Sequence, residues 1–337
     1  MSKTMRDVGE FGFIRDLRTR LASRNPFVVL GAGDDAAILR PTPGREMVFT
    51  TDLMVEGRHF DLKTMTPRQL GVKSMAVNLS DCAAMGAQPK ACVVSLGAPK
   101  TFPYKKIMSF CDGLVQGGRP FGCLVVGGDT VGSDKLVVNV AMLGEVEKGK
   151  ALRRDEAKEG DVLFVTGTLG DSGGGWHSLS HPGQKAKEAR PILHQRHLAP
   201  VPRCQVGRLL VRAGFSRCAI DISDGLSSEV NHLCEESGVG AEVHAQAIPL
   251  SSALSYYCRE MRLDPLTFAL DGGEDYELLF TAPVSKAAKI LGRIAVSTGV
   301  RVTPIGRIVS AQKGIRFIDE KGRRRPLKAK GFDHFGS

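Results

Sequence analysis

The sequence predicts an α/β or α+β fold with two sheets, distributed over two domains. Strand-like and helix-like stretches alternate along the chain, and many of the turns between them are Gly-Gly or Gly-Asp pairs. Such alternation is typical of sheets covered by helices. A length of 337 residues is more than one hydrophobic core usually supports, so two domains are expected. A polar, charged segment at 147–161 places the boundary, which gives domains 1–149 and 150–337.

The first domain alternates helices and strands. Apolar residues at spacings of three and four predict a helix within 5–24. Short runs rich in β-branched and aromatic residues predict strands at 27–30 and 47–51. Thr66-Pro67 marks the start of a second helical stretch. The elements expected after it are a strand at 91–96, a helix at 103–118, a strand at 123–126 that opens into Gly127-Gly128-Asp129-Thr130, and a strand at 136–145.

The second domain is expected to open with a strand at 162–165 and a Gly-rich turn, TGTLGDSGGGW. Polar residues, two prolines and a glycine predict a mobile excursion at 177–197. The sequence AIDISDGLSSE opens a helix that continues through Cys234, with Asp224 as its N-cap. The other expected elements are a helix at 203–213, a Gly-Gly turn and strand within 270–283, a helix at 285–297 and a strand at 302–309.

The composition is that of an ordinary soluble globular protein, with 42% hydrophobic and 24% charged residues. No apolar stretch approaches the roughly 20 residues of a membrane span, and the N-terminus lacks a signal-peptide core, so a cytoplasmic protein is expected. The net charge of +10 favours polyanionic partners such as nucleotides, phosphorylated metabolites or nucleic acid. The eight cysteines contain no Cys-x-x-Cys pair, which favours buried free thiols over a zinc or redox site.

Acidic residues recur after strand-like or Gly-rich segments, where they are expected at strand ends or turns. One such acid is ordinarily a turn residue or a helix cap, but the recurrence points to a shared site. Gathered carboxylates repel one another and require cations, and oxygen ligands with little Cys or His select Mg²⁺ or Mn²⁺. Because Mg²⁺ usually joins one or two carboxylates to substrate phosphates, several magnesium ions on a polyphosphate are predicted. The acids are Asp34, Asp35, Asp52, Asp81, Asp129, Asp221, Asp224, Glu274 and Asp275.

Several common nucleotide-binding motifs are missing. Residues 71–74 have the Lys-Ser of a P-loop but lack its upstream glycines, and neither H-R-D nor D-F-G occurs. Residues 31–36 formally fit G-x-G-x-x-A, yet Pro41 and Pro43 leave no room for the helix of a dinucleotide fold. The Gly-rich turn after Val165 is equally consistent with phosphate binding at a helix start and with a tight strand-to-helix turn.

Three other features have a functional and a structural interpretation. His59 could orient a substrate phosphate, although a lone histidine is more often structural. His194 and His197 resemble a ligand pair, but the absence of a nearby carboxylate in the sequence argues against a metal site. The basic segment 321–330 has little aromatic interleaving, which favours a solvated surface over nucleic-acid binding.

Taken in order, the motifs resemble those of the thiamine-monophosphate kinase family. This family belongs to a superfamily of ATP-using enzymes that includes aminoimidazole ribonucleotide synthetase, selenophosphate synthetase and a hydrogenase-maturation protein. GGDT and DISDG are shared by the superfamily, whereas VEGRHF paired with NLSDCAAMGA, and the GFDHF end, are specific to the kinases. The matching pieces are GEFGFI (9–14), GDDAAIL (33–39), TTDLMVEGRHF (50–60), KSMAVNLSDCAAMGAQP (73–89), GGDT (127–130), VTGTLGDS (165–172), RHLAPVPR (196–203), AIDISDGL (219–226), GGEDYELLF (272–280), IGRI (305–308) and GFDHF (331–335).

The resemblance implies an N-terminal sheet-and-helix domain that forms a homodimer through its sheet, and a C-terminal α+β, sandwich-like domain. It places ATP and Mg²⁺ in a cleft between the domains. It also implies transfer of the γ-phosphoryl group of ATP to thiamine monophosphate, giving thiamine diphosphate and ADP. Aminoimidazole ribonucleotide synthetase is the closest alternative, because it shares the ATP and metal frame. A nucleic-acid binder and an inactive nucleotide-binding scaffold are disfavoured by the large set of acids.

The site residues follow from the same resemblance. It implies Mg²⁺ ligands at Asp35, Thr50, Thr51, Asp52, Asp81, Asp129, Asp221 and Asp224, of which Asp52, Asp129 and Asp224 are the catalytic set. It implies ATP contacts at Gly128, Asp129, Arg154, Ser223 and, on a looser match, Tyr104. It implies contacts with thiamine monophosphate at His59, Glu274 and Phe332. The attacking phosphate oxygen is already deprotonated near neutral pH (second pKa about 6), so no strong general base is expected.

Overall fold

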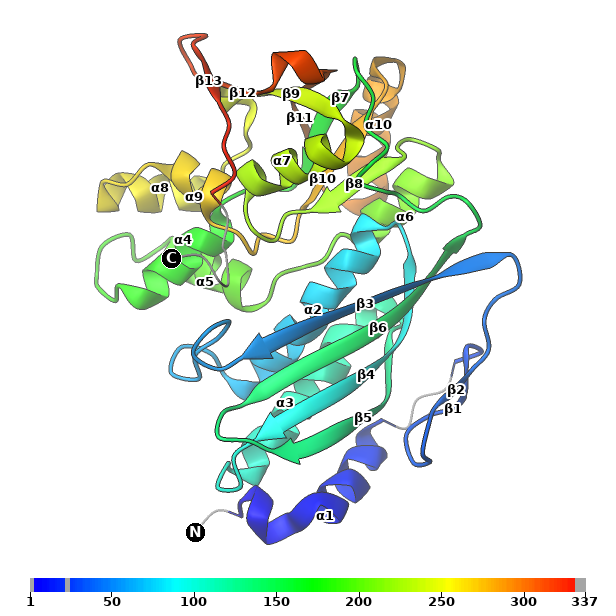
Figure 1. Ribbon diagram of the computed structural model, residues 1–337. Coiled ribbons are helices and arrows are strands. Elements are labelled where there is room, and N and C mark those ends of the chain that lie inside the picture. The colour runs from blue at the N-terminus through cyan, green and yellow to red at the C-terminus, as the bar shows by residue number, and fades with distance from the viewer. Residues whose placement is uncertain (1–2, 22–24, 331–337) are drawn as a thin grey trace. The chain divides into compact units, whose positions relative to one another are not determined.

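The computed structural model describes residues 3–21 and 25–330. Contacts between residues divide the chain into two compact units, each with its own sheet and helices (Figure 1). The first unit comprises Met1–Cys82 and Ala87–Gly149, and the second comprises Ala83–Gly86 and Lys150–Ser337. None of the helices in the described part of the chain has the length and apolar character that a bilayer-spanning segment requires.

A four-stranded sheet in the order β3-β6-β4-β5 forms the first unit. Neighbouring strands are antiparallel, except that β4 and β5 are parallel. Helices α2 and α3 cover one face of this sheet (Figure 1), and Met75 of α2 contacts Cys92 of β4 there. The main elements are β3 (Arg45–Val55), α2 (Pro67–Ala84), β4 (Gln88–Ala98), α3 (Tyr104–Gly118), β5 (Leu124–Gly132) and β6 (Val137–Glu147).

The opposite face of this sheet is only partly covered. A small hairpin packs Phe27 against Val126 of β5 at one end of the face. Away from the hairpin, Phe49 and Leu53 of β3 are 69% and 55% exposed. A substantial apolar surface therefore remains open on this side of the unit. The remaining elements of the unit are α1 (Met5–Arg20), β1 (Val28–Leu30), β2 (Ile38–Leu39) and a short 3-10 helix, η1 (Arg119–Phe121).

The second unit is built on a seven-stranded sheet in the order β13-β12-β9-β11-β7-β10-β8. Neighbouring strands are antiparallel, except that β12 and β9 are parallel. The strands are β7 (Val162–Thr166), β8 (Cys218–Asp221), β9 (Val239–His244), β10 (Leu278–Ala282), β11 (Val302–Ser310), β12 (Ile315–Ile318) and β13 (Arg324–Pro326). The helices are α4 (Asp171–Ser180), α5 (Arg190–Leu198), α6 (Cys204–Arg212), α7 (Leu226–Ser237), α8 (Ser252–Met261), α9 (Pro265–Asp271), α10 (Val284–Thr298) and the 3-10 turns η2 (Ala245–Ala247) and η3 (Ala311–Lys313).

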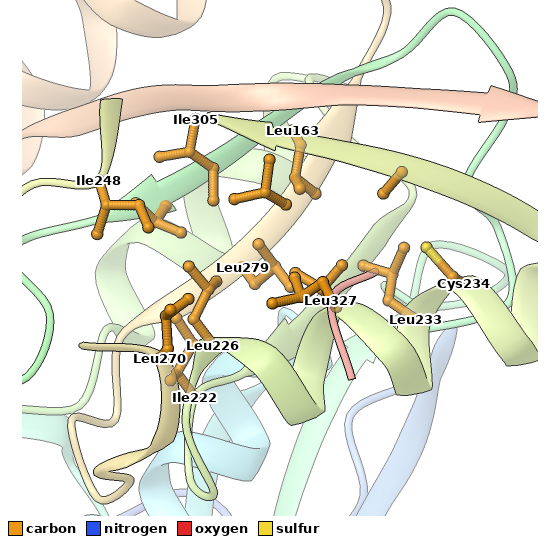
Figure 2. Packing of buried hydrophobic residues seen from close by; sticks show 14 of the residues in the cluster. Leu163, Ile222, Leu226, Leu233, Cys234, Ile248, Leu270, Leu279, Ile305 and Leu327 are labelled. Carbon is orange, nitrogen blue, oxygen red and sulfur yellow. The ribbon is translucent and has the colours of Figure 1, made fainter. Parts of the chain in front are cut away.

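The main core of the second unit lies between its sheet and helix α7. Figure 2 shows Leu226 and Leu233 of α7 on the side of the helix that faces Leu163 and Leu279 of the sheet, and all four side chains are fully buried. Because side chains alternate along a strand, the residue after Leu163 points to the other face of the sheet. There Phe164 and Phe280 stack with ring centroids 5.2 Å apart, and α10 packs against α6 and β11. The fold confirms the predicted mixture of helices and sheets.

Residues 177–197 are not the mobile excursion that the sequence predicts. Helices α4 and α5 occupy most of this stretch and pack with α8 around a second core that includes Leu193 and Tyr257. Arg190 is buried beside that core, and its guanidinium donates hydrogen bonds to the carbonyl oxygens of Ser178, His181 and Lys185. Ser178, Arg190 and His197 are therefore buried hydrogen-bonding groups, while most other polar residues of the stretch are exposed, and composition alone does not separate the two kinds.

Candidate active site

Two of the predicted metal ligands meet between β3 and α2. Asp52 lies in the middle of β3, and Asp81 lies in the last turn of α2. Their side chains are hydrogen-bonded to each other, and Thr50 Oγ1 donates a short hydrogen bond to Asp81 Oδ2. The expectation that these acids lie at strand ends or turns is wrong, because both sit inside regular elements. The structure nevertheless brings Thr50, Asp52 and Asp81 together.

The Asp52–Asp81 pair is electrostatically strained. Burial, and then the neighbouring Asp81 carboxylate, raise the pKa of Asp52 from its ordinary value of 3.8 to about 7. Two carboxyl groups this close cannot both ionise freely unless a cation offsets their repulsion. The two carboxylates and the Thr50 hydroxyl are the hard oxygen donors that Mg²⁺ prefers, so these residues fit the predicted ion. In the described part of the chain, no three His, Cys, Asp or Glu side chains form a metal-ligand group.

Asp129 lies on the opposite face of the same sheet from Asp52. Asp129 belongs to a row of paired residues that ends at Leu53, the immediate neighbour of Asp52 in β3. This row consists of Asp129, Ser95, Asn139 and Leu53. Because successive side chains along a strand point to opposite faces, Asp129 shares the open face with Leu53. Thr51 lies on that face too, and its hydroxyl donates to Asn139 Oδ1 at 2.8 Å.

The Gly127-Gly128-Asp129-Thr130 motif continues the strand instead of following it. All four residues lie within β5, where Gly128 stands opposite Val94 of β4. A Cβ atom on Gly128 would come within 2.0 Å of the Val94 carbonyl oxygen, so only glycine allows this approach. The side chain of Asp129 accepts a hydrogen bond from the Thr130 backbone N–H at 2.8 Å. The close approach of β4 thus explains why position 128 is a glycine, and the predicted contact of Gly128 with ATP stays a prediction.

Asp35 lies in the exposed turn between β1 and β2. Asp34 Oδ1 accepts a hydrogen bond from the Asp35 backbone N–H at 2.9 Å. Asp34 therefore shapes the turn, and both Asp34 and Asp35 are exposed to solvent. This turn is a separate element from β3 and α2, which carry the Asp52–Asp81 pair, so the metal role of Asp35 stays a prediction.

His59 follows β3 and turns its ring back toward the end of that strand. The backbone N–H of Val55 donates to His59 Nδ1 at 3.0 Å. Because a backbone N–H can only donate, Nδ1 must be unprotonated, and the ring proton of the neutral imidazole is on Nε2. His59 is thus held as a neutral histidine whose Nε2–H is a hydrogen-bond donor.

Tyr104, expected to contact ATP on a looser match, and Arg154, expected to contact ATP by its motif, have different surroundings. The Tyr104 hydroxyl, at the start of α3, donates to Asp16 Oδ2 of α1 at 2.6 Å. Burial, together with this carboxylate, raises the pKa of Tyr104 to about 12. Arg154 is exposed, and its backbone carbonyl accepts a hydrogen bond from Ser237 Oγ at 2.9 Å. Tyr104 therefore has an internal structural role, and the Arg154 guanidinium lies at the surface.

In the second unit, the Asp221–Asp224 segment joins β8 to α7. Asp221 is buried at the end of β8. The prediction that Asp224 caps α7 is wrong, because Gly225 occupies the N-cap position without a side-chain bond. Instead Glu229, in the first turn of α7, accepts hydrogen bonds from the backbone N–H groups of Ser223 and Asp224 at 3.3 and 2.9 Å. The carboxylate of Glu229, a residue of the helix, thus fixes the backbone of the segment that precedes the helix.

The turn that carries Glu274 lies directly against that segment. The Glu274 N–H donates to the Ser223 carbonyl at 2.6 Å, and the Tyr276 N–H donates to the Ile222 carbonyl at 2.9 Å. Both Glu274 and Tyr276 have positive φ, at 57° and 51°, which is costly for residues other than glycine. Oxygen Oε2 of Glu274 lies 3.4 Å from Nδ1 of His197. The structure therefore places the backbone of Glu274 against Ser223, and the predicted substrate contact of Glu274 and ATP contact of Ser223 stay predictions.

The Gly-rich turn after β7 has a structural explanation. The backbone N–H groups of Gly170 and Ser172, at the start of α4, donate to the two carboxylate oxygens of Asp275 at 2.6 and 3.1 Å. The N-terminus of α4 is thus already occupied by an internal carboxyl group, whose pKa burial raises well above its ordinary value, and this favours a tight strand-to-helix turn over phosphate binding. The role of Asp275 is missed by sequence reasoning, because its partners lie 105 and 103 residues away along the chain.

The two histidines of α5 that resemble a ligand pair contact serines of α4. His194 Nε2 and His197 Nδ1 each hydrogen-bond to a serine of α4, at 2.9 and 3.1 Å. The expectation that no carboxylate lies near these histidines is wrong for His197, because the fold brings Glu274 to it. Phe332 lies outside the described residues, so its predicted substrate contact stays a prediction.

The chain matches known proteins along nearly its whole length. Residues 33–146 match the model of the AIR synthase related protein, N-terminal domain, and residues 158–319 that of its C-terminal domain. Thiamine-monophosphate kinase of Haemophilus influenzae is 37% identical, over 97% of this chain and 98% of that protein. Two solved structures are also similar. Thiamine-monophosphate kinase from Stenotrophomonas maltophilia K279a is 36% identical with a TM-score of 0.82, covering 94% of this chain and 98% of that one. AaThiL complexed with AMPPCP and TMP is 33% identical with a TM-score of 0.78, covering 99% and 100%.

The two-sheet architecture and the paired family domains define an AIR synthase related protein. Within that class, the sequence of this chain is more than 30% identical to several thiamine-monophosphate kinases over almost their full length. The chain belongs to the thiamine-monophosphate kinase family.

Proposed function

We propose that this chain phosphorylates thiamine monophosphate with ATP and Mg²⁺, giving thiamine diphosphate and ADP by direct in-line transfer. The observation that carries the proposal is the Asp52–Asp81 pair beside Thr50, in a chain that matches thiamine-monophosphate kinases from end to end. The similar structure of AaThiL with AMPPCP and TMP supports the two substrates. The similarity to the kinases favours this activity over aminoimidazole ribonucleotide synthesis.

The acids of the first unit are proposed to hold the metal. Bound Mg²⁺ supplies positive charge that offsets the repulsion between the two phosphates and helps to align them. Asp52, Asp81 and Thr50 provide a carboxylate pair and a hydroxyl on one face of the sheet. The other ligands assigned by resemblance are Thr51 and Asp129, which lie on the opposite, open face of this sheet, and Asp35, Asp221 and Asp224. Within the whole set, Asp52, Asp129 and Asp224 are proposed as the catalytic residues.

Four side chains are proposed to orient the substrates. His59 donates from Nε2 to a phosphate or hydroxyl oxygen, because its Nδ1 is fixed as an acceptor. Glu274 and Phe332 contact the thiamine moiety, and Arg154 offers an exposed guanidinium to the polyphosphate. Gly128 and Ser223, with Tyr104 on the looser match, complete the ATP contacts. No residue is assigned as a general base, since the attacking phosphate oxygen is ionised near neutral pH (second pKa about 6).

The chain is further proposed to act as a homodimer through the open face of the first sheet. Phe49, Leu53 and Val131 on this face are 69%, 55% and 62% exposed, which is unusual for apolar residues clustered on one sheet. A second copy of the same face would cover them. Residues 1–149 would then serve metal binding, ATP binding and dimerisation, and residues 150–337 would carry the Gly-rich turn, DISDG and GGEDY. The cytoplasmic location and the absence of nucleic-acid and membrane partners stay predictions.

Product analysis tests the proposal. The protein is incubated with ATP, MgCl₂ and thiamine monophosphate, and thiamine diphosphate and ADP are separated by chromatography. A parallel reaction contains EDTA in excess over the metal. Formation of both products only with Mg²⁺ is expected. ATP consumption without thiamine diphosphate would discard the substrate, and aminoimidazole ribonucleotide formation from its precursor would favour the alternative enzyme.

A further inference from the structure

Helix α5 places a buried histidine against the carboxylate assigned to substrate binding. His197 is 6% exposed. Its Nδ1 lies 3.1 Å from Ser172 Oγ of α4 and 3.4 Å from Glu274 Oε2. Glu274 itself remains partly open to solvent, with 34% of its side chain exposed. One side of the carboxylate is therefore held by protein, and another is accessible to a ligand.

The backbone around Glu274 is fixed from several directions. Besides the hydrogen bond from its N–H to Ser223, the next residue, Asp275, binds the N-terminus of α4. Glu277 is buried and paired with the guanidinium of Arg203, whose Nε donates at 2.6 Å. Residues in positive-φ conformations persist only where the surrounding structure enforces them, and they cluster at functional sites. The surrounding hydrogen bonds thus keep the backbone of Glu274 in a strained conformation that fixes the direction of its side chain.

Glycines in α4 allow α5 to come close enough for this contact. A Cβ atom on Gly175 would lie 2.2 Å from the Leu193 carbonyl oxygen and 2.9 Å from the Cβ of His197. Any larger residue would therefore push α5 away from α4. His197 lies on α5, and the turn that carries Glu274 is tied to the start of α4 through Asp275, so the spacing of the two helices affects the distance between imidazole and carboxylate.

The chemistry of the contact favours a hydrogen bond from the imidazole to the carboxylate. An unprotonated Nδ1 would turn its lone pair toward the lone pairs of Glu274 Oε2, which is repulsive. A proton on Nδ1 instead faces Glu274 Oε2 and Ser172 Oγ, both acceptors. The Nδ1–H group can thus hold Oε2 of a carboxylate whose side chain is 34% exposed.

We propose that His197 is a positioning residue that orients the Glu274 carboxylate toward the thiamine part of the substrate. The inference rests on the proposed function, which assigns Glu274 to thiamine monophosphate. It gives the α4–α5 segment a role in substrate specificity. Without the imidazole, the Glu274 carboxylate loses the contact with Nδ1 and is held less closely in the orientation that the substrate requires. The affinity for thiamine monophosphate therefore falls, and the affinity for ATP stays almost unchanged.

The test compares His197→Ala with His197→Asn and with a matched control, His194→Ala. The asparagine side chain of the second variant can return an N–H group near the position of Nδ1, whereas His194 lies one turn earlier on α5 and bonds to Ser178. For His197→Ala we expect the KM for thiamine monophosphate to rise about ten-fold, the size of one hydrogen bond to a charged group. The KM for ATP and kcat stay within about two-fold. Partial recovery is expected for His197→Asn, and wild-type constants for His194→Ala.

A double-mutant comparison separates positioning from loss of structure and from failure of the proposed function. Glu274→Ala should raise the KM for thiamine monophosphate, and adding His197→Ala to it should raise that KM no further. If Glu274→Ala leaves the KM unchanged, the substrate role of Glu274 is wrong and the positioning proposal falls with it. If Glu274→Ala raises the KM but His197→Ala does not, or if the two effects multiply, only the positioning proposal is overturned. Thermal melting of each variant shows whether it is folded, and His197→Asn carries the test if the alanine variant is not.

Discussion

Asp52 and Asp81 are close enough for each to alter the protonation of the other. In a pair of this kind the first charge forms readily, and the second forms only against repulsion and partial burial. The raised pKa of Asp52, about 7, expresses that cost. A divalent cation bound by the pair offsets the same repulsion. Protons and the metal ion therefore compete for the two carboxylates.

Asp52→Asn should abolish turnover while the protein stays folded. The substitution keeps the shape of the side chain and removes one charge of the pair, so metal binding is lost and the repulsion with Asp81 disappears. The expected result is a loss of kcat of at least about a hundred-fold, with an unchanged or higher melting temperature without metal. Asp112→Asn is the matched control, because Asp112 is an exposed acid bonded to Arg20. Near-wild-type turnover of Asp52→Asn at saturating Mg²⁺ would contradict the metal role.

The same pair predicts a pH dependence of stability in the metal-free protein. The pKa of Asp52 is higher in the folded chain, about 7, than its ordinary value of 3.8, so the folded state binds the proton more tightly. The stabilisation is therefore present below about pH 4 and is lost as the pH rises through about 7. With EDTA present, the melting temperature should fall more steeply between about pH 5 and pH 8 for wild type than for Asp52→Asn. Equal slopes for the two proteins would show that Asp52 does not titrate in this range.

The sequence identifies the acids of the site but not their geometry. Asp52 and Asp81 are recognisable from their motifs, yet their contact depends on how α2 packs on β3. The assignment of Asp129 to the other face needs the register of four strands, which no local pattern contains. Asp224 is misassigned as a helix cap because Glu229, five residues later, supplies the acceptor instead. In each case a distant or competing partner decides what the side chain does.

At the scale of elements, the packing of α4 on α5 depends on a glycine in the middle of a helix. Gly175→Ala should destabilise the second unit, because the added Cβ would come within 2.2 Å of the Leu193 carbonyl oxygen. Overpacking of this kind costs about 1–3 kcal/mol. Gly292→Ala in α10 is the control, since a Cβ there meets nothing within 4 Å, and it should stabilise by about 0.5–1 kcal/mol. Denaturant unfolding measures both changes, and equal effects would refute the close-packing explanation.

Regular elements with strong periodicity are predicted well, and elements that depend on tertiary contacts are not. Helices such as α3 and α10 are found within one or two residues of their expected ends. The strand β5 extends through GGDT, because pairing with β4 holds glycines that would otherwise mark a turn. Helices α4 and α5 are hidden by polar residues and prolines, and their stability comes from buried hydrogen bonds such as those of Arg190.

At the scale of the whole molecule, the open apolar face predicts the state of assembly. Phe49→Glu should convert a dimer into monomers, because it places a charge on the apolar face that forms the proposed contact. Val296→Glu in α10 is the control, since Val296 is 88% exposed but lies on the second unit. Light scattering coupled to size exclusion gives the masses. A wild-type monomer, or a Phe49→Glu dimer, would contradict the proposed face.

Strand β3 serves two faces with alternate residues. Thr50 and Asp52 point toward α2 and the proposed metal, and Thr51 and Leu53 point to the open face. Inserting or deleting one residue ahead of Thr50 would exchange the two sets and damage both at once. Natural variation in this strand should therefore consist of substitutions, with insertions and deletions confined to the turns at its ends. An engineer seeking a monomer can substitute Phe49, but must keep the length of β3 and, on the same open face, the proposed ligand Thr51.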